Sequence, residues 1–215
     1  MSHPIKLSQW ICFDWDGTLI DSTTRNFNAL KMAVDSICID TTATTIKKIC
    51  ESTSLQSPDW NLLFKKIPIS KKSIKAIKKE WRKNILFMPI ADLFLDVKDV
   101  LSILSKKYDI GIVTSAERWR LNLEIQYHNL QHLINGSICS DEVSQQKPLP
   151  EPLREFIRKY KGEIRLFIGD HIDDMNMATA AGVDGCMIIK NSLITPPPTH
   201  PFLQVHQLVE IMQFI

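Results

Sequence analysis

The sequence predicts an α/β protein with a doubly wound parallel sheet, a Rossmann-like core, and an inserted all-helical cap domain. Short apolar runs that suit buried parallel strands alternate with amphipathic segments along residues 88–215. One further run of this kind, residues 10–13, stands near the start of the chain, whereas the apolar spacing from 23 to 87 is helical throughout. The predicted division is therefore a catalytic core of residues 1–22 and 88–215 and a helical cap of residues 23–87.

The first strand, residues 10–13, ends in two carboxylates, Asp14 and Asp16. Four apolar residues shortly before Gly17 fit a buried strand better than a helix, and period-2 geometry points both carboxylates to one side. Open α/β sheets place their chemistry at the carboxyl ends of strands. Two like charges there are costly unless a cation or a shared proton compensates. The alternative interpretation is an Asx-type turn that caps the next helix.

The insert has the strongest helical signal of the chain. Apolar residues recur at steps of three and four. The clearest apolar stripe of the insert consists of Ile74, Ile77, Trp81 and Ile85. Shorter helical patterns cover 23–37, 46–50 and 62–67. Residues 47–83 contain eleven Lys/Arg and three Asp/Glu, a local charge of +8, within a chain of net charge +2. We expect Lys75, Lys78 and Lys79 to face solvent; the alternative is that such lysines face a cleft and steer anionic substrates.

Alternating helices and strands follow the insert, as a doubly wound sheet with right-handed crossovers requires. The pattern predicts helices over 96–107, 117–133, 150–160 and 173–181, and strands at 108–113, 138–139, 164–168 and 186–189. It also predicts a turn at Asn135-Gly136, a stiff linker at 196–198 and a closing helix over 206–214.

Polar residues stand at two further places where a phosphoryl group could be held. Thr114 and Ser115 end the strand at 108–113, and their hydroxyl groups can donate to phosphoryl oxygens. The alternative is a helix N-cap, a common role for such residues. Lys147 is followed by Pro148, and further prolines restrict the segment that carries its ammonium group. An ammonium there would offset clustered carboxylates, although a lone lysine is ordinarily a surface charge.

Three carboxylates, Asp170, Asp173 and Asp174, lie within five residues at the end of the strand at 164–168. Such a cluster is hard to justify without a cation. Mg²⁺ prefers oxygen ligands and binds through one or two carboxylates together with substrate phosphate. We interpret His171 as a hydrogen-bonding or substrate-facing group and Asp173 as a solvent-facing or helix N-terminal charge.

These segments, taken in order, resemble the four motifs of the haloacid dehalogenase superfamily. The resemblance implies that Asp14 attacks phosphorus and that Asp16 shuttles a proton. Thr114 is the residue of the second motif, with Ser115 as its companion in substrate binding, and Lys147 stands in the third motif. The implied cofactor is Mg²⁺, with side-chain oxygens from Asp14 and Asp170, the backbone carbonyl of Asp16, and Asp174 as a supporting acid. The insert resembles, in position and size, the small helical cap of the phosphoglycolate phosphatase and β-phosphoglucomutase branch.

The expected activity is that of a Mg²⁺-dependent phosphatase, a phosphoric monoester hydrolase that acts on a small phosphorylated metabolite through an aspartyl-phosphate. Catalysis would be mainly positioning and charge stabilisation. One alternative is a phosphomutase, in which the phosphoenzyme transfers its phosphoryl group to a second sugar hydroxyl. Another is a non-catalytic interaction protein that kept the fold, which would not by itself require these residues.

Composition narrows the expected partners and compartment. The chain has 44% hydrophobic and 23% charged residues, ordinary values for a soluble globular protein. Its net charge of +2 does not suggest a nucleic-acid-binding protein, and no apolar stretch approaches the length that spans a bilayer. Five cysteines without a CxxC pair suggest a reducing compartment. With no signal peptide recognised at the N-terminus, we expect a cytoplasmic protein whose partner is a small phosphorylated substrate.

Overall fold

A computed structural model describes residues 8–37, 71–190 and 202–215. The chain forms two compact units, Met1–Ile20 together with Leu93–Ile215, and Asp21–Asp92. The helical patterns expected at 46–50 and 62–67 and the linker expected at 196–198 lie outside the described residues. None of the helices in the described ranges combines the length and the apolar character that crossing a membrane requires.

The larger unit is built on one parallel sheet, in which the described residues form six strands in the order β3-β2-β1-β4-β5-β6. The strands are β1 Gln9–Phe13, β2 Asp109–Val113, β3 Gly136–Ile138, β4 Glu163–Gly169, β5 Gly185–Ile188 and β6 Leu203–Val205. The first strand of the chain thus lies between β2 and β4, which follow about 100 and 150 residues later. From β1 the chain adds β2 and β3 on one side of the sheet and then β4, β5 and β6 on the other. Open α/β sheets bind ligands at such a change of direction in strand order.

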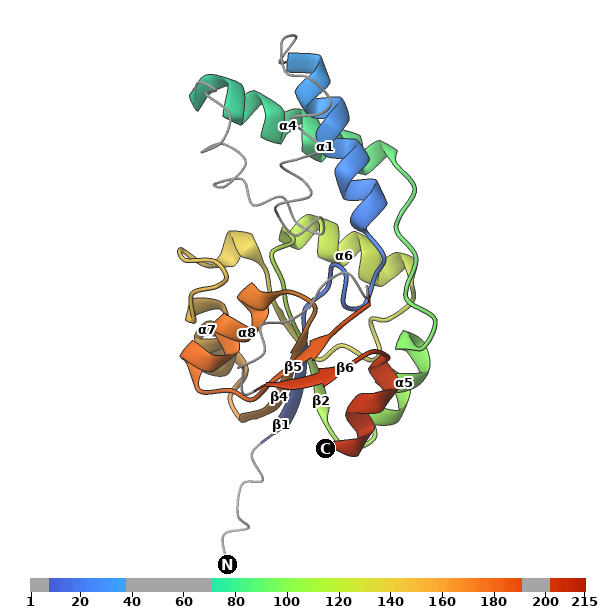
Figure 1. Cartoon of the computed structure of the whole chain (residues 1–215), viewed down its shortest axis with the longest axis vertical. Coiled ribbons are helices and arrows are strands. Elements are labelled where there is room, and N and C mark those ends of the chain that lie inside the picture. Colours follow the sequence, from blue (N-terminus) through green and yellow to red (C-terminus); the bar gives the residue numbers. More distant parts are fainter. Residues whose placement is uncertain (1–7, 38–70, 191–201) are drawn as a thin grey trace, which may run out of the picture. The chain divides into compact units, whose positions relative to one another are not determined.

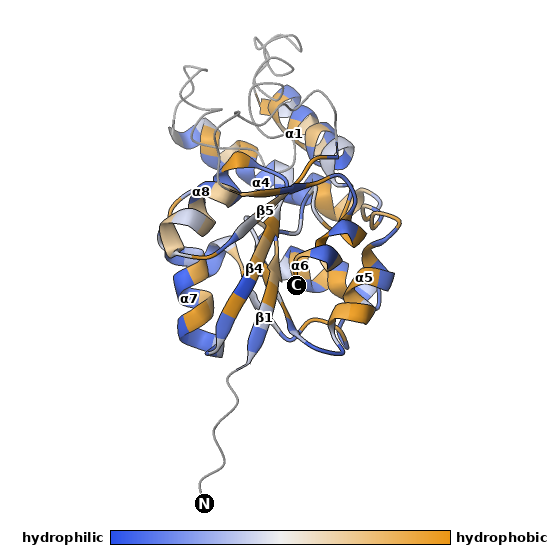
Figure 2. Cartoon of the chain, turned by 60° about the horizontal axis from the view of Figure 1, so that its bottom comes forward, coloured by the Kyte–Doolittle hydropathy of each residue, from blue (hydrophilic) through white to orange (hydrophobic). Residues whose placement is uncertain are grey.

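Helices cover both faces of this sheet, which confirms the predicted doubly wound α/β fold. Their bounds are α5 Val97–Leu104, α6 Arg118–Tyr127, α7 Glu151–Tyr160 and α8 Ile172–Ala181, with 3-10 turns η1 Ser140–Glu142 and η2 Leu208–Gln213. Figures 1 and 2 show α7 and α8 on one face and α5 and α6 on the other. The central strands β1 and β4 are largely apolar in Figure 2, as strands covered on both faces must be.

Aromatic packing fixes the face under α7. The rings of Trp10 and Phe156 meet edge to face with centroids 5.0 Å apart, and Tyr160 lies 4.7 Å from Phe156. Gly111 in β2 leaves room for this cluster, because a Cβ there would come within 2.5 Å of the Phe156 ring. Cys12, Cys139 and Cys186 are buried free thiols, a setting in which cysteine packs as a small apolar residue.

Three expectations about element boundaries are wrong. The helix expected over 117–133 ends at Tyr127, because Asn129 takes a left-handed conformation with φ 58°. Gly136 begins β3 instead of lying in a turn. The closing segment is the 3-10 turn η2, not an α-helix, and it is preceded by β6, a strand of three residues that the sequence pattern did not predict.

The smaller unit contains two described helices, α1 Thr23–Ile37 and α4 Lys71–Phe87, which pack against each other. The Asn84 side chain donates to the carbonyl of Ala29 at 3.1 Å. Buried apolar side chains include those of Leu30 and Val34 on α1 and Ile77, Trp81 and Ile85 on α4. The apolar stripe expected on 74–85 is therefore the packing face of α4.

Candidate active site

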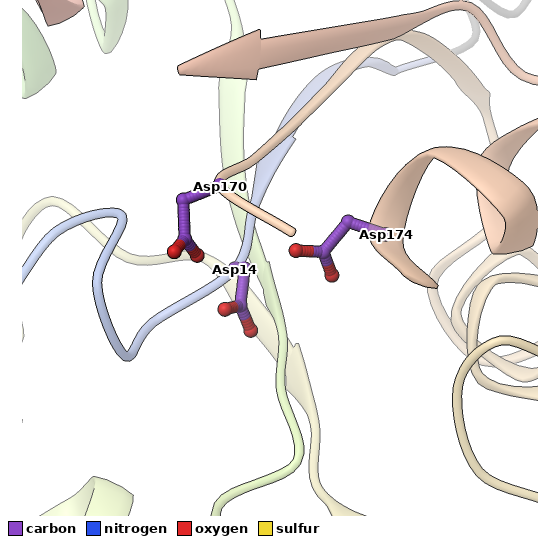
Figure 3. Close-up of side chains that lie close together, drawn as sticks. All are labelled: Asp14, Asp170 and Asp174. Carbon is purple, nitrogen blue, oxygen red and sulfur yellow. The ribbon is translucent and has the colours of Figure 1, made fainter. Parts of the chain in front are cut away.

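The carboxyl ends of β1 and β4 bring together acids from distant parts of the chain. Asp14 directly follows β1, Asp170 directly follows β4, and the backbone N–H of Asp14 donates to the carbonyl of Ile168 at 2.8 Å. Asp174 joins them from the first turn of α8. All three residues are buried, and one carboxylate oxygen of each lies within 4.8 Å of the others. Figure 3 shows the three carboxyl groups gathered at this edge.

Lys147 is the cation of this cluster. Its Nζ donates to Oδ1 of Asp14 and to Oδ1 of Asp174, at 2.6 Å each. Burial by itself would lower the pKa of Lys147, but Asp14 and then Asp174 raise it well above its usual value, so the ammonium is charged. The structure therefore places Lys147 in contact with the predicted nucleophile, as the sequence motifs led us to expect.

The ionisation of Asp14 is strongly perturbed by its surroundings. Burial raises its pKa from the ordinary 3.8 to about 7; Lys147 opposes this shift, while Asp174 and Asp16 add to it. The three clustered carboxylates outnumber the single ammonium that touches two of them. The cluster thus has room for additional positive charge.

The end of β4 and the first turn of α8 approach each other closely at the Asp174 side of the cluster. A Cβ on Gly169 would lie 2.5 Å from side-chain atoms of Asp174, so glycine is needed there. The Oδ2 of Asp174 accepts from the backbone N–H of His171 at 3.2 Å, and His171 Nδ1 accepts from the backbone N–H of Asp173 at 3.2 Å. His171 is accordingly the N-cap of α8, and Asp173 lies in its first turn, half-buried.

Asp16 is buried beside the cluster but has a different partner. Its carboxylate accepts hydrogen bonds from both terminal nitrogens of the Arg120 guanidinium, Nη1 to Oδ1 at 2.8 Å and Nη2 to Oδ2. Glu124, one turn further along α6, accepts from the indole N–H of Trp15 at 2.6 Å. Sequence reasoning missed this arrangement.

A signal for these residues was present in the sequence of α6. Its apolar residues 119, 121, 123 and 125 alternate, so they cannot share one helical face. Leu123 is exposed, whereas Arg120 and Glu124 are buried next to Leu121. An i, i+4 pair of opposite charges on the buried side of a helix predicts an ionic contact with the core.

Thr114 and Ser115 continue β2, the strand beside β1. The Thr114 hydroxyl oxygen accepts from the backbone N–H of Ala116 at 3.0 Å, so its proton can be donated elsewhere. Thr114 is not the N-cap of α6, which is Glu117. Thr18, a second residue that the sequence reasoning did not select, donates from its hydroxyl to Oδ1 of Asp170 at 3.1 Å.

The donor set fits a hard divalent cation. Asp14, Asp170 and Asp174 present buried carboxylate oxygens within reach of one another, and oxygen ligands are those that Mg²⁺ prefers. The Thr18 hydroxyl orients one of these carboxylates, which is what an outer partner of a metal ligand does. The chemistry and the charge of the cluster therefore fit a Mg²⁺ ion.

Comparison with known proteins agrees with this geometry. The family model of haloacid dehalogenase-like hydrolases matches residues 11–188. A phosphoglycolate phosphatase of Aliivibrio fischeri is 26% identical over 192 residues, which cover 85% of this chain and 83% of that protein.

Two solved structures share the fold. A haloacid dehalogenase-like family hydrolase of Streptococcus pneumoniae has 22% identity and a TM-score of 0.76, over 96% of this chain and 98% of that one. CbbY of Rhodobacter sphaeroides, in complex with xylulose-1,5-bisphosphate, has 12% identity and the same TM-score of 0.76, over 95% and 96% of the two chains. The predicted family and its enzyme class, phosphoric monoester hydrolase, are confirmed, and the chain belongs to the haloacid dehalogenase-like hydrolases.

Proposed function

We propose that this hydrolase is a Mg²⁺-dependent phosphatase that removes the phosphoryl group of a small metabolite through an aspartyl-phosphate on Asp14. The observation that carries the proposal is the contact of Lys147 Nζ with Asp14 Oδ1 at 2.6 Å, inside a cluster of three buried acids. An ammonium at this distance keeps a buried carboxylate available as a nucleophile and faces the site where phosphoryl charge develops.

Side chains of the larger unit would divide the reaction between them. In the first step Asp14 attacks phosphorus, and Asp16 gives a proton to the departing oxygen. In the second step Asp16 takes a proton from water, which attacks the aspartyl-phosphate and releases inorganic phosphate. Lys147, Thr114 and Ser115 would hold the phosphoryl oxygens by charge and hydroxyl donation.

Mg²⁺ would be held by side-chain oxygens of Asp14 and Asp170, the backbone carbonyl of Asp16, and Asp174 in support. Bound there, it would neutralise phosphoryl charge and help to align the substrate for attack. The contacts of Asp174 favour this secondary role. One of its carboxylate oxygens already accepts from the Lys147 ammonium, and the other accepts from a backbone N–H.

The substrate class that we propose is a small phosphorylated carboxylic acid or sugar, with phosphoglycolate as the first compound to test. The relative from Aliivibrio fischeri, a phosphoglycolate phosphatase, supports this choice. We further propose that the unit Asp21–Asp92 acts as a cap that discriminates among leaving groups. The residues identified in the larger unit are suited to phosphoryl groups and do not by themselves select a leaving group.

The test is phosphate release from a panel of phosphorylated metabolites with Mg²⁺, with Ca²⁺ or with EDTA. We expect turnover with Mg²⁺, poor turnover with Ca²⁺, whose larger shell misplaces the in-line attack, and none with EDTA. D14N should lose at least about 10³-fold in kcat, because an amide is a very poor nucleophile. The matched variant D173N, at a half-buried acid outside the proposed machinery, should retain activity within about threefold.

Acid quenching during turnover should trap phosphate on Asp14 in the wild-type enzyme. A D14N enzyme that keeps a tenth of the wild-type kcat would refute the covalent mechanism. Turnover in EDTA equal to that in Mg²⁺ would refute the metal requirement but leave the phosphatase activity standing.

A further inference from the structure

Helix α6 makes a buried ionic contact with the loop that carries the proposed catalytic acids. Arg120 and Asp16 have side chains that are 2% and 3% exposed, and both terminal nitrogens of the guanidinium donate to the carboxylate. Glu124 has 1% exposure, lies 3.6 Å from Arg120 Nη1, and accepts from the Trp15 indole. One turn of α6 therefore holds two consecutive loop residues, Trp15 and Asp16.

Charged side chains are costly to bury unless they are paired, so the pairing of these acids and cations shows which groups hold each other. Burial alone would lower the pKa of Arg120, but Asp16 and then Glu124 raise it above its usual value, so the guanidinium is charged. Lys147 pairs with Asp14 and Asp174, whereas Arg120 pairs with Asp16. Each acid of the Asp14-Trp15-Asp16 segment thus has a buried cation of its own.

Lys147 and Arg120 differ in how they orient the carboxylates that they contact. An ammonium is a point charge, but a guanidinium with two parallel hydrogen bonds also sets the plane of the carboxylate. Asp16 lies beyond the end of β1, and Gly17 behind it has φ 72°, so the sheet does not determine the side-chain orientation. The Arg120 guanidinium determines it, and Glu124 lies close to the same guanidinium, 3.6 Å from Nη1.

We propose that Arg120 is a positioning residue that holds the Asp16 carboxylate in the orientation needed to activate water in the second half of the reaction. This inference rests on the proposed phosphatase function. In that step the water oxygen bonds to phosphorus, and a water proton moves to an Asp16 oxygen. The bond between phosphorus and the Asp14 oxygen breaks, and its electron pair returns to the Asp14 carboxylate. A bidentate guanidinium suits this step because its two hydrogen bonds fix the plane of the carboxylate that accepts the proton.

The test separates the two halves of the reaction with p-nitrophenyl phosphate and Mg²⁺. The p-nitrophenolate group of this substrate departs without much help from an acid, so kcat/KM reports formation of the phosphoenzyme. Hydrolysis of the phosphoenzyme then limits kcat. For R120M we expect kcat and KM to fall together by tenfold or more, with kcat/KM reduced less than about threefold. A burst of p-nitrophenolate close to one equivalent per site should precede slow turnover.

The matched control is R118M, the same substitution on the same helix. Arg118 contacts Ser137 and Glu142 at the surface and is not part of the proposed machinery. Its kcat and KM should stay within about twofold of the wild type. KM does not depend on the fraction of active enzyme, so partial misfolding of R120M cannot imitate the expected fall.

R120K provides a second variant in case R120M does not fold. It keeps the charge but offers no planar fork, so kcat and KM should both fall by about threefold to fivefold. A lower kcat with unchanged KM, or no change in either constant, would overturn the proposal for Arg120 and leave the phosphatase function intact. Absence of turnover in both the wild type and R118M would overturn the proposed function and this inference with it.

Discussion

Asp14 is a buried acid whose charge depends on the cations around it. Without a bound metal ion its pKa is raised to about 7, chiefly by burial, so near neutral pH the carboxyl group is partly protonated. A cation that binds to the carboxylate must displace that proton below pH 7. The protonation of Asp14 would therefore govern how strongly the cluster binds the proposed metal ion.

Mg²⁺ binding to the resting enzyme should weaken as the pH falls through 7. Above pH 7 Asp14 is ionised and no proton is displaced; at pH 6 the apparent affinity should be about tenfold lower, from one unit of difference between pH and pKa. The measurement is the Mg²⁺-induced rise in Tm at pH 8 and at pH 6, in protein first treated with EDTA. We expect the larger rise at pH 8.

Two alanine variants act as controls for this measurement. Asp170→Ala should lose most of the Mg²⁺-induced rise at both pH values, and Asp173→Ala should keep it, because Asp173 is paired with His171 instead of the cluster. Equal losses in the two variants would mean that the ligand assignment at the start of α8 is wrong.

At the scale of single residues, the sequence motifs predicted the cluster well but not its supporting contacts. Asp14, Lys147, Asp170 and Asp174 were predictable because they stand next to strand ends or prolines in a recognisable order. Arg120 and Thr18 were not, because a contact with Asp16 or Asp170 depends on how a helix and a loop fold back onto the sheet. No local sequence pattern predicts that these residues, far apart in the chain, come into contact.

At the scale of elements, strands were easier to predict than the ends of helices. The apolar runs of β1 and β2 are continuous because both faces of the sheet are covered, and the run of β4 is continuous from Leu166 onward, after the exposed Arg165. The end of α6 depends on the left-handed residue Asn129, and Leu130 and Leu133 beyond it are buried in turns instead of in another helical turn. The prediction of a helix over 117–133 was therefore wrong beyond Tyr127.

The packing of β2 against α7 can be tested at Gly111. A Cβ there would lie 2.5 Å from the Phe156 ring and 2.6 Å from Cys12 Sγ, both fully buried, so G111A should lower the free energy of unfolding by about 1–3 kcal/mol. Urea unfolding measures this change. G185A is the matched variant in β5, where the nearest atom is the flexible Met175 Sδ at 3.0 Å, and it should cost less than about 1 kcal/mol.

G111A as stable as the wild type would show that α7 can shift to accept the methyl group. A larger loss in G185A than in G111A would mean that the Met175 side chain is the more rigid neighbour.

At the scale of the whole molecule, the basic charge is concentrated in the segment that we propose as a cap. On α4, Lys75 and Lys79 are exposed and Lys78 is half-buried, whereas Ile77 and Trp81 are buried. This distribution supports the interpretation that these lysines form a solvated face and do not bind substrate.

Replacing Lys75, Lys78 and Lys79 together with Gln should change kcat/KM by less than about threefold, since charges that stay in contact with solvent have modest effects. The measurement is steady-state kinetics on the best substrate of the panel, at low and at high salt. A tenfold loss that disappears at high salt would show instead that this lysine face attracts the anionic substrate.

The central place of β1 in the sheet also has a consequence for biosynthesis. The ribosome makes this strand first, but its neighbours β2 and β4 begin at Asp109 and Glu163. At ~5–20 residues per second, the last residue of β4 is added roughly 8 to 30 s after the last residue of β1. Until β2 has been made, an apolar segment next to the proposed nucleophile has no neighbouring strand to pair with. The strand on which the proposed chemistry depends therefore precedes both of its neighbours, and it gains the second of them only when β4 has been added.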